Sequence, residues 1–230
     1  MMSYDCDLIR LSDEAKASGL FLYFTFLELQ KEVVGDPLSE AIAKALSVIR
    51  ASVSLEGLKE DPVVRAYRDF YWRLGIDPTK VRPSSEALAR RALRGEFPRV
   101  SPLVDAGNVA SLETLVPIGI YDLDLLRPPL VVRLSEAGER FMPIGGKEQP
   151  LPRGYPIMVD SSGTVVHIYA HRDSTLTSVR PSTRRALVVG TGAPKVPEDL
   201  VERAVRRVVE LVKVIGWAPA GPLCEAKPDV

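Results

Sequence analysis

The chain is poor in the residues that most often hold metals or cross-link small proteins. Its 230 residues include only two cysteines and two histidines. Cys6 and Cys224 stand near opposite ends, and neither has a second ligand at the spacing of a zinc motif, so we expect no metal and no cofactor. A disulfide between the two ends is the alternative to free thiols, and free thiols are expected in a reducing compartment.

Long apolar runs and common catalytic signatures are also missing. No apolar stretch approaches the roughly 18 residues of a membrane span, and the first ten residues lack the basic region of a signal peptide. We therefore expect a cytoplasmic protein with no membrane partner. No P-loop, dinucleotide-binding fingerprint or G-x-S-x-G elbow occurs. The sequence does not indicate an oligomeric state.

The net charge is zero, which argues against tight, sequence-independent binding of nucleic acid. The charges are nevertheless uneven, because residues 62–99 carry a net +5 and residues 100–126 a net −4. Arg90 and Arg94 lie one turn apart on a predicted helix, and such a face can bind phosphates. The alternative is an ordinary solvated helix surface.

Helical signals come first along the chain, short strands follow, and one helix closes it. Residues 19–29 form an apolar and aromatic run that predicts a buried strand. Asp-Pro pairs begin two helices, at Asp36 and Asp61. Further helices are predicted at 85–94, 103–115 and 197–216, and strands at 118–121, 130–135, 140–144, 156–160, 164–171 and 186–190. This order indicates an α+β fold rather than alternating βαβ units.

We expect one globule in three parts. Residues 1–60 supply an N-terminal strand and helix, residues 61–216 form the main domain, and residues 217–230 form a loose, proline- and glycine-bearing tail.

Residues 103–124 mix polar side chains with core residues, among them Asp105 and Asn108. Buried carboxylates and amides must be hydrogen-bonded, and carboxylates are the most costly to bury. This segment therefore predicts either a network that ties the fold together or the floor of a site.

Both histidines fall in the predicted strand 164–171. Side chains alternate along a strand, so His167, Tyr169 and His171 are expected to share one face, with Arg172 and Asp173 at its end. Histidine serves as a general base or hydrogen-bonding group near neutral pH. One interpretation is a pocket wall that binds a planar or anionic group, and the other is an exposed sheet face with an Arg–Asp pair at its edge.

Five segments together carry a family resemblance. They are YRDFYWRLGIDP (67–78), RPSSEALARRALRG (82–95), FPRVSPLVDAGNVASLETLVPIGIYDLD (97–124), GERFMPIGG (138–146) and HRDSTLT (171–177). In order and spacing the region from about residue 67 to 195 resembles the B3/B4 domain of the β-subunit of phenylalanyl-tRNA synthetase, in a free-standing form.

The resemblance implies a β-sandwich of unusual topology flanked by helices, with the predicted C-terminal helix added. It also implies an editing function, in which tyrosine wrongly attached to a tRNA is hydrolysed in a pocket between two subdomains. We therefore predict a tRNA-binding, editing-type domain that acts as a trans-acting hydrolase of mischarged aminoacyl-tRNA. Its expected partners are tRNA and an amino-acid moiety. The alternatives are a non-catalytic module that binds an amino acid or tRNA, and a small-metabolite hydrolase that uses no nucleic acid.

Two family positions differ in this chain. The resemblance places a pocket histidine where Gly119 stands, and a pocket glutamate on a strand that here covers residues 186–190 and has no acid. Other groups would then supply the chemistry. Our candidates are His171 and Asp173 as catalytic residues, with Asp173 orienting His171 or binding the substrate's amino group. The substrate-binding candidates are Asp105, Asn108, His167, Tyr169 and Arg172, the last for an anionic group, and the RNA-binding candidates are Arg90 and Arg94.

Overall fold

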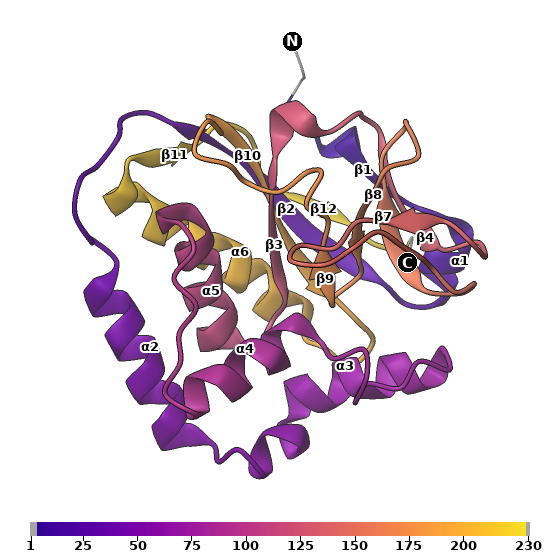
Figure 1. Cartoon of the computed structure of the whole chain (residues 1–230), viewed down its shortest axis with the longest axis horizontal. Coiled ribbons are helices and arrows are strands. Elements are labelled where there is room, and N and C mark those ends of the chain that lie inside the picture. Colours follow the sequence, from indigo (N-terminus) through magenta and orange to yellow (C-terminus); the bar gives the residue numbers. More distant parts are fainter. Residues whose placement is uncertain (1–3, 229–230) are drawn as a thin grey trace.

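The computed structural model describes residues 4–228 and has a mixed α+β architecture, shown in Figure 1. Within these residues the strands form two five-stranded sheets and a small ribbon of β5 (Arg140–Phe141) and β6 (Gln149–Pro150). Helices gather on one side of the molecule in Figure 1, and most strands lie on the other. The predicted fold class is confirmed.

The sheet that carries helices on its outer face is built on β2 (Phe21–Leu29) and β10 (Arg185–Gly192), which pair antiparallel along their length. β3 (Ile118–Asp122) pairs with the other edge of β10. The residues of β2 from Phe21 to Leu27 are all buried, which explains an almost continuous apolar run in place of alternation.

The other sheet has the order β1-β4-β7-β8-β9. Its strands are β1 (Ile9–Leu11), β4 (Leu130–Leu134), β7 (Pro156–Val159), β8 (Val165–Ile168) and β9 (Arg172–Asp173). Only the β1–β4 pair within this sheet is parallel. One hydrophobic cluster contains Val132, Met158 and Val166 of this sheet together with the residues of β2 and β10.

Helix α6 (Glu198–Val212) packs against β2 and β10, and α5 (Pro102–Thr114) packs against β3 and α6. Helices α2 (Ser39–Ser52) and α4 (Ser84–Leu93) cover α5. The other helical elements of residues 4–228 are α1 (Asp13–Ala17), α3 (Pro62–Arg73) and four short 3-10 helices, η1 (Cys6–Leu8), η2 (Gly57–Glu60), η3 (Leu123–Leu125) and η4 (Lys213–Ile215). None of the helices in residues 4–228 is long and apolar enough to cross a membrane.

The prediction of a loose tail is wrong. β11 (Trp217–Pro219) and β12 (Cys224–Ala226) pair with the free edge of β2, where they satisfy backbone groups that would otherwise lack partners. Trp217 and Cys224 are both buried. Both strands of the tail are therefore part of the sheet.

The expectation of free thiols is also wrong. Cys6 and Cys224 form a disulfide, with Cα atoms 5.2 Å apart. β12 lies against both η1 and β1, which brings the two ends of the chain together. The link therefore joins segments 218 residues apart.

Candidate functional site

The predicted strand 164–171 does not run straight through both histidines. β8 ends at Ile168, the chain reverses at Ala170, whose φ is +64°, and β9 begins at Arg172. His167 pairs with Asp173 across the resulting hairpin. The prediction that the two histidines and Tyr169 share one strand face is therefore wrong, because alternation stops where the chain turns.

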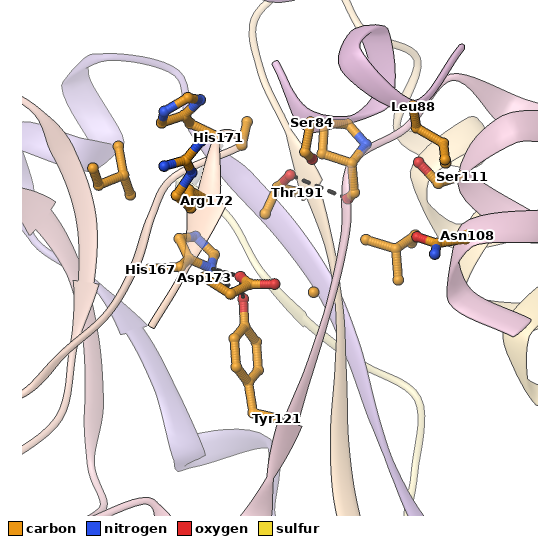
Figure 2. Close-up of a pocket in the computed structure, with 15 residues that line it drawn as sticks. Ser84, Leu88, Asn108, Ser111, Tyr121, His167, His171, Arg172, Asp173 and Thr191 are labelled. Carbon is orange, nitrogen blue, oxygen red and sulfur yellow. Dashed lines mark hydrogen bonds and ion pairs between the residues drawn. The ribbon is translucent and has the colours of Figure 1, made fainter. Parts of the chain in front are cut away.

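The β8–β9 hairpin forms one wall of a pocket of about 140 Å³. The opposite wall comes from α4, α5 and β3, as Figure 2 shows. The polar residues that line it are Ser84, Asn108, Ser111, Tyr121, His167, His171, Arg172, Asp173 and Thr191. We call it the polar pocket.

His171 is half-buried in this wall and is fixed by the main chain. Its Nδ1 lies 2.7 Å from the carbonyl oxygen of Arg82. Because a carbonyl only accepts hydrogen bonds, Nδ1 carries the hydrogen and Nε2 keeps its lone pair. Burial, and to a lesser extent the charge of Arg172, lowers the pKa of His171, which favours the neutral ring. The imidazole can therefore accept a proton or a hydrogen bond through Nε2.

A chain of three side chains lies at the base of the hairpin. The Tyr121 hydroxyl donates to Asp173 Oδ1 at 2.8 Å and also contacts His167 Nδ1. Since that hydroxyl has one hydrogen, His167 Nδ1 must donate to the Tyr121 oxygen in this arrangement. His167 Nε2 is then a buried acceptor, and no residue of 4–228 bonds to it.

Burial shifts the pKa values of this chain of groups in the directions expected from desolvation. It lowers the pKa of His167 to about 3 and raises the pKa of Tyr121. It raises the pKa of Asp173 to about 6, although the hydrogen bond from Tyr121 acts in the opposite direction. His167 is neutral at pH 7, whereas Asp173 is mainly ionised.

Arg172 and Asn108 offer unused polar groups to the pocket. Arg172 is exposed and forms no ion pair within residues 4–228. Asn108 is half-buried on α5, and its side-chain amide makes no hydrogen bond with that part of the chain. A guanidinium group without a carboxylate partner can bind an anionic group at the rim of the polar pocket.

A second hollow of about 300 Å³ opens beside the polar pocket. Both cavities are lined by Asn108, Ile118 and Asp173, which form the seam between them. Most of the other residues around the second hollow are aliphatic. We call it the apolar hollow.

The structure brings five predicted site residues into the polar pocket: Asn108, His167, His171, Arg172 and Asp173. Their roles stay predictions. Asp173 contacts Tyr121 and His167, whereas His171 is held by the Arg82 carbonyl. The expected orientation of His171 by Asp173 is therefore replaced by orientation through the main chain.

Two predicted substrate-binding residues have structural contacts instead. Asp105 accepts hydrogen bonds from Arg99 Nε at 2.7 Å and from the Val100 amide at 2.9 Å, so it fixes the start of α5. Tyr169 is fully buried, and its hydroxyl reaches the carbonyls of Phe21 and Gly192. Neither residue lines the polar pocket.

The two predicted RNA-binding residues differ in whether they are free to contact a phosphate. Arg90 Nε bonds to Glu86, 2.9 Å away, and Glu86 is fully buried between Arg90 and Arg68. Arg94 is exposed beyond the end of α4. Only Arg94 is thus available to a phosphate without breaking an internal ion pair.

Sequence reasoning missed Tyr121, Ser84, Ser111 and Thr191. For Tyr121 a signal existed, because alternation along β3 places it on the same face as Gly119. Ser111 also had a local signal, because it lies one turn after Asn108 on the same helix. Ser84 and Thr191 carry no such signal, since their place in the pocket depends on packing between distant segments.

Comparison with known proteins identifies the family. A model of the B3/4 domain matches residues 66–216. The chain belongs to the B3/4 domain family. The relatives include the phenylalanine–tRNA ligase β-subunit of Xanthomonas euvesicatoria, 28% identical over 180 residues, which covers 66% of this chain and 22% of the relative. The β-subunit of Thermococcus onnurineus is 33% identical over 98 residues, covering 34% of this chain and 17% of that protein.

The fold of this B3/4 protein also occurs in a solved structure. An N-terminal fragment of the phenylalanyl-tRNA synthetase β-subunit from Pyrococcus horikoshii matches with a TM-score of 0.52 and 16% identity, over 95% of this chain and 50% of the fragment. The chain thus spans about a fifth of the first curated relative and half of the fragment.

The first family position that differs, Gly119, lines the polar pocket. A Cβ at Gly119 would overlap the hydroxyl of Tyr121. The room for a side chain at this position is thus occupied by Tyr121. The second differing position, where the resemblance places a glutamate, lies on β10. This strand packs so closely against α6 that a Cβ on Gly190 would lie 2.8 Å from Val205 Cγ2.

Proposed function

We propose that this protein is an editing domain that hydrolyses the ester bond between an amino acid and the 3′ end of a tRNA. The observation that carries the proposal is the place of His171 in the wall of a small pocket, with Nδ1 bonded to the Arg82 carbonyl and Nε2 left as an acceptor. Burial lowers the pKa of this ring, which favours its neutral form. The family relatives, which are named as phenylalanine–tRNA ligase β-subunits, support aminoacyl-tRNA as the substrate class.

In the proposed reaction, a water molecule attacks the ester carbonyl and His171 Nε2 accepts its proton. The bond between the carbonyl carbon and the ribose oxygen then breaks, and His171 returns the proton to that oxygen. The products are the free amino acid and a tRNA with its terminal hydroxyl restored. Aminoacyl esters are intrinsically labile, so holding water and ester in the correct geometry supplies much of the acceleration. Arg172 would contact the anionic backbone or the charge that develops on the carbonyl oxygen.

The size of the site agrees with a small ligand. Pockets for drug-sized molecules measure roughly 300 to 1,000 Å³, and the polar pocket measures about 140 Å³. A pocket of this size cannot hold more than the end of a tRNA, so the remainder would lie outside, where the exposed Arg172 could contact it.

The test uses purified protein and a panel of tRNAs, each charged with a different labelled amino acid, both matched and mismatched. Loss of label is measured against buffer alone. We expect faster deacylation of a subset of mismatched tRNAs. Binding of tRNA without any acceleration would overturn the hydrolase proposal in favour of a binding module.

The same assay includes amino-acid ethyl esters, which lack the tRNA. If these esters are hydrolysed as efficiently as aminoacyl-tRNA and no tRNA binds in a mobility-shift assay, the protein is a small-metabolite hydrolase and the proposal is wrong. A clear preference for the tRNA ester supports it.

A further inference from the structure

The apolar hollow has a lining that suits a hydrocarbon group. Its walls include Val104, Gly107, Ile118, Ile120 and Val179. Asp173 is the one charged residue among those that line it, and it stands at the seam with the polar pocket. Ser178 already donates its hydroxyl to the Thr175 carbonyl at 3.1 Å. A buried hydroxyl or charge on a ligand would therefore find few partners inside the hollow.

The seam carries two acceptors that the described part of the chain leaves unused. Asp173 Oδ1 accepts from Tyr121, but no residue of 4–228 donates to Oδ2. Figure 2 shows the carboxylate directed across the polar pocket toward Asn108 on α5. The side-chain oxygen of Asn108 is likewise without a donor within this part of the chain.

An ammonium group is the chemical complement of these two acceptors. It has three donors and a positive charge, and its hydrogen bond to a carboxylate is charge-assisted. A half-buried carboxylate, with 31% of its side chain exposed, is a stronger partner than one fully in water, because the local dielectric constant is lower.

We propose that the apolar hollow is the side-chain subsite for a hydrophobic α-amino acid, and that Asp173 and Asn108 hold its ammonium group at the seam. This inference rests on the proposed function, because it places the ester in the polar pocket beside His171. It deepens that function by naming the substrate class: an amino acid with a hydrocarbon side chain, as opposed to one with a charge or a phenol hydroxyl.

The experiment measures binding by titration calorimetry, with amino-acid amides as probes because they carry the ammonium group and no ester. The set is leucinamide, phenylalaninamide, tyrosinamide, lysinamide and 4-methylpentanamide, the last being leucinamide without its amino group. We expect binding of leucinamide or phenylalaninamide. Removal of the amino group should weaken binding about tenfold or more, as for loss of a charge-assisted hydrogen bond. The phenol of tyrosinamide should weaken binding about 10- to 100-fold relative to phenylalaninamide.

Two pairs of variants locate the ligand. Asp173→Asn should weaken the binding of leucinamide about tenfold and leave the binding of 4-methylpentanamide unchanged. Asp124→Asn, at an exposed position of η3, should alter the binding of neither amide. Val179→Phe fills the hollow and should abolish binding, whereas Leu176→Phe, three residues away and outside both cavities, should not. Thermal melting confirms that each variant is folded.

Equal affinity for leucinamide and its deaminated analogue, preference for lysinamide, or no binding of any amide at millimolar concentration would overturn the inference. So would full binding by a folded Val179→Phe variant. The proposed function is judged separately. Amide binding with no deacylation of any tRNA would overturn the hydrolase proposal and leave the subsite proposal intact. Deacylation without preference for hydrophobic amino acids would overturn the subsite proposal and leave the hydrolase proposal intact.

Discussion

The hydroxyl of Tyr121 occupies the space that a side chain on Gly119 would need. Both residues lie on β3 and line the polar pocket. The absence of a Cβ at Gly119 thus allows Tyr121 to reach Asp173 and His167. The position at which the resemblance places a histidine is filled from a neighbouring residue, with a hydroxyl in place of an imidazole.

Removal of that hydroxyl should destabilise the protein. Tyr121→Phe leaves His167 Nδ1 and Asp173 Oδ1 without a partner in a buried environment, and we expect a loss of about 1–3 kcal/mol in the free energy of unfolding. Tyr155→Phe is the matched control, because Tyr155 is half-buried and its hydroxyl makes no hydrogen bond within residues 4–228. Chemical denaturation of both variants measures the difference, and equal losses would contradict the role of the Tyr121 hydroxyl.

The pH dependence of stability should reveal two opposing groups. Burial lowers the pKa of His167 from 6.5 to about 3, so between these values the folded protein binds fewer protons than the unfolded chain, and stability falls as the pH falls. Burial raises the pKa of Asp173 from 3.8 to about 6, so between these values stability rises as the pH falls. Over the shared window the two effects oppose each other.

Asp173→Asn removes one of them. Relative to the wild type, this variant should lose up to about 1.4 kcal/mol of stability for each pH unit of acidification between about 6 and 4. His167→Gln should show the opposite deviation. Denaturation curves across this range test the prediction, and a constant difference from the wild type at every pH would refute it.

The disulfide should contribute substantially to stability. It closes a very long loop between Cys6 and Cys224, and disulfides typically contribute about 2–4 kcal/mol. We expect a reducing agent to lower the melting temperature of the wild type and to have no effect on a Cys6→Ser, Cys224→Ser double variant. The same melting temperature with and without reductant in the wild type would be inconsistent with this contribution.

Binding of tRNA should depend on Arg94 and Arg172, which form no ion pair within residues 4–228. Arg94→Gln and Arg172→Gln should each weaken binding and reduce the slope of log affinity against log salt by about one. Arg206→Gln on α6 is the control, since Arg206 pairs with Glu202. Arg90 is unsuitable for this test, because its replacement disturbs the buried Glu86. Unchanged salt slopes for the Arg94 and Arg172 variants would show that neither side chain contacts tRNA.

Local signals explain which parts of the fold were predictable. Asp61 accepts hydrogen bonds from the amides of Val63 and Val64, and Ser101 caps α5 in the same way. Caps and apolar periodicity are short-range features, so these helices could be placed from the sequence. The disulfide and the strands of the tail depend on contacts across nearly the whole chain, which a sequence pattern does not reveal.

The candidate site was likewise predictable only where the signal is local. Segments 103–124 and 165–174 were correctly singled out as rich in polar groups, and they do meet at the polar pocket. The reversal at Ala170 was missed because alanine gives no signal for a positive φ. Asp105 is predicted as a site residue because it is a carboxylate in an apolar segment. Its structural pairing with Arg99 could not be predicted, because the sequence does not fix the direction of an exposed arginine side chain.

The most direct test of the account is the single-turnover deacylation of a tRNA charged with a hydrophobic amino acid by the wild type, His171→Ala and His171→Gln. Glutamine can still donate to the Arg82 carbonyl but cannot accept a proton, so it separates catalysis from structure. We predict that both variants lose about 100-fold or more in rate, while the glutamine variant keeps its free energy of unfolding within about 1 kcal/mol of the wild type. A folded glutamine variant that deacylates at the wild-type rate would contradict the assignment of His171 as the base.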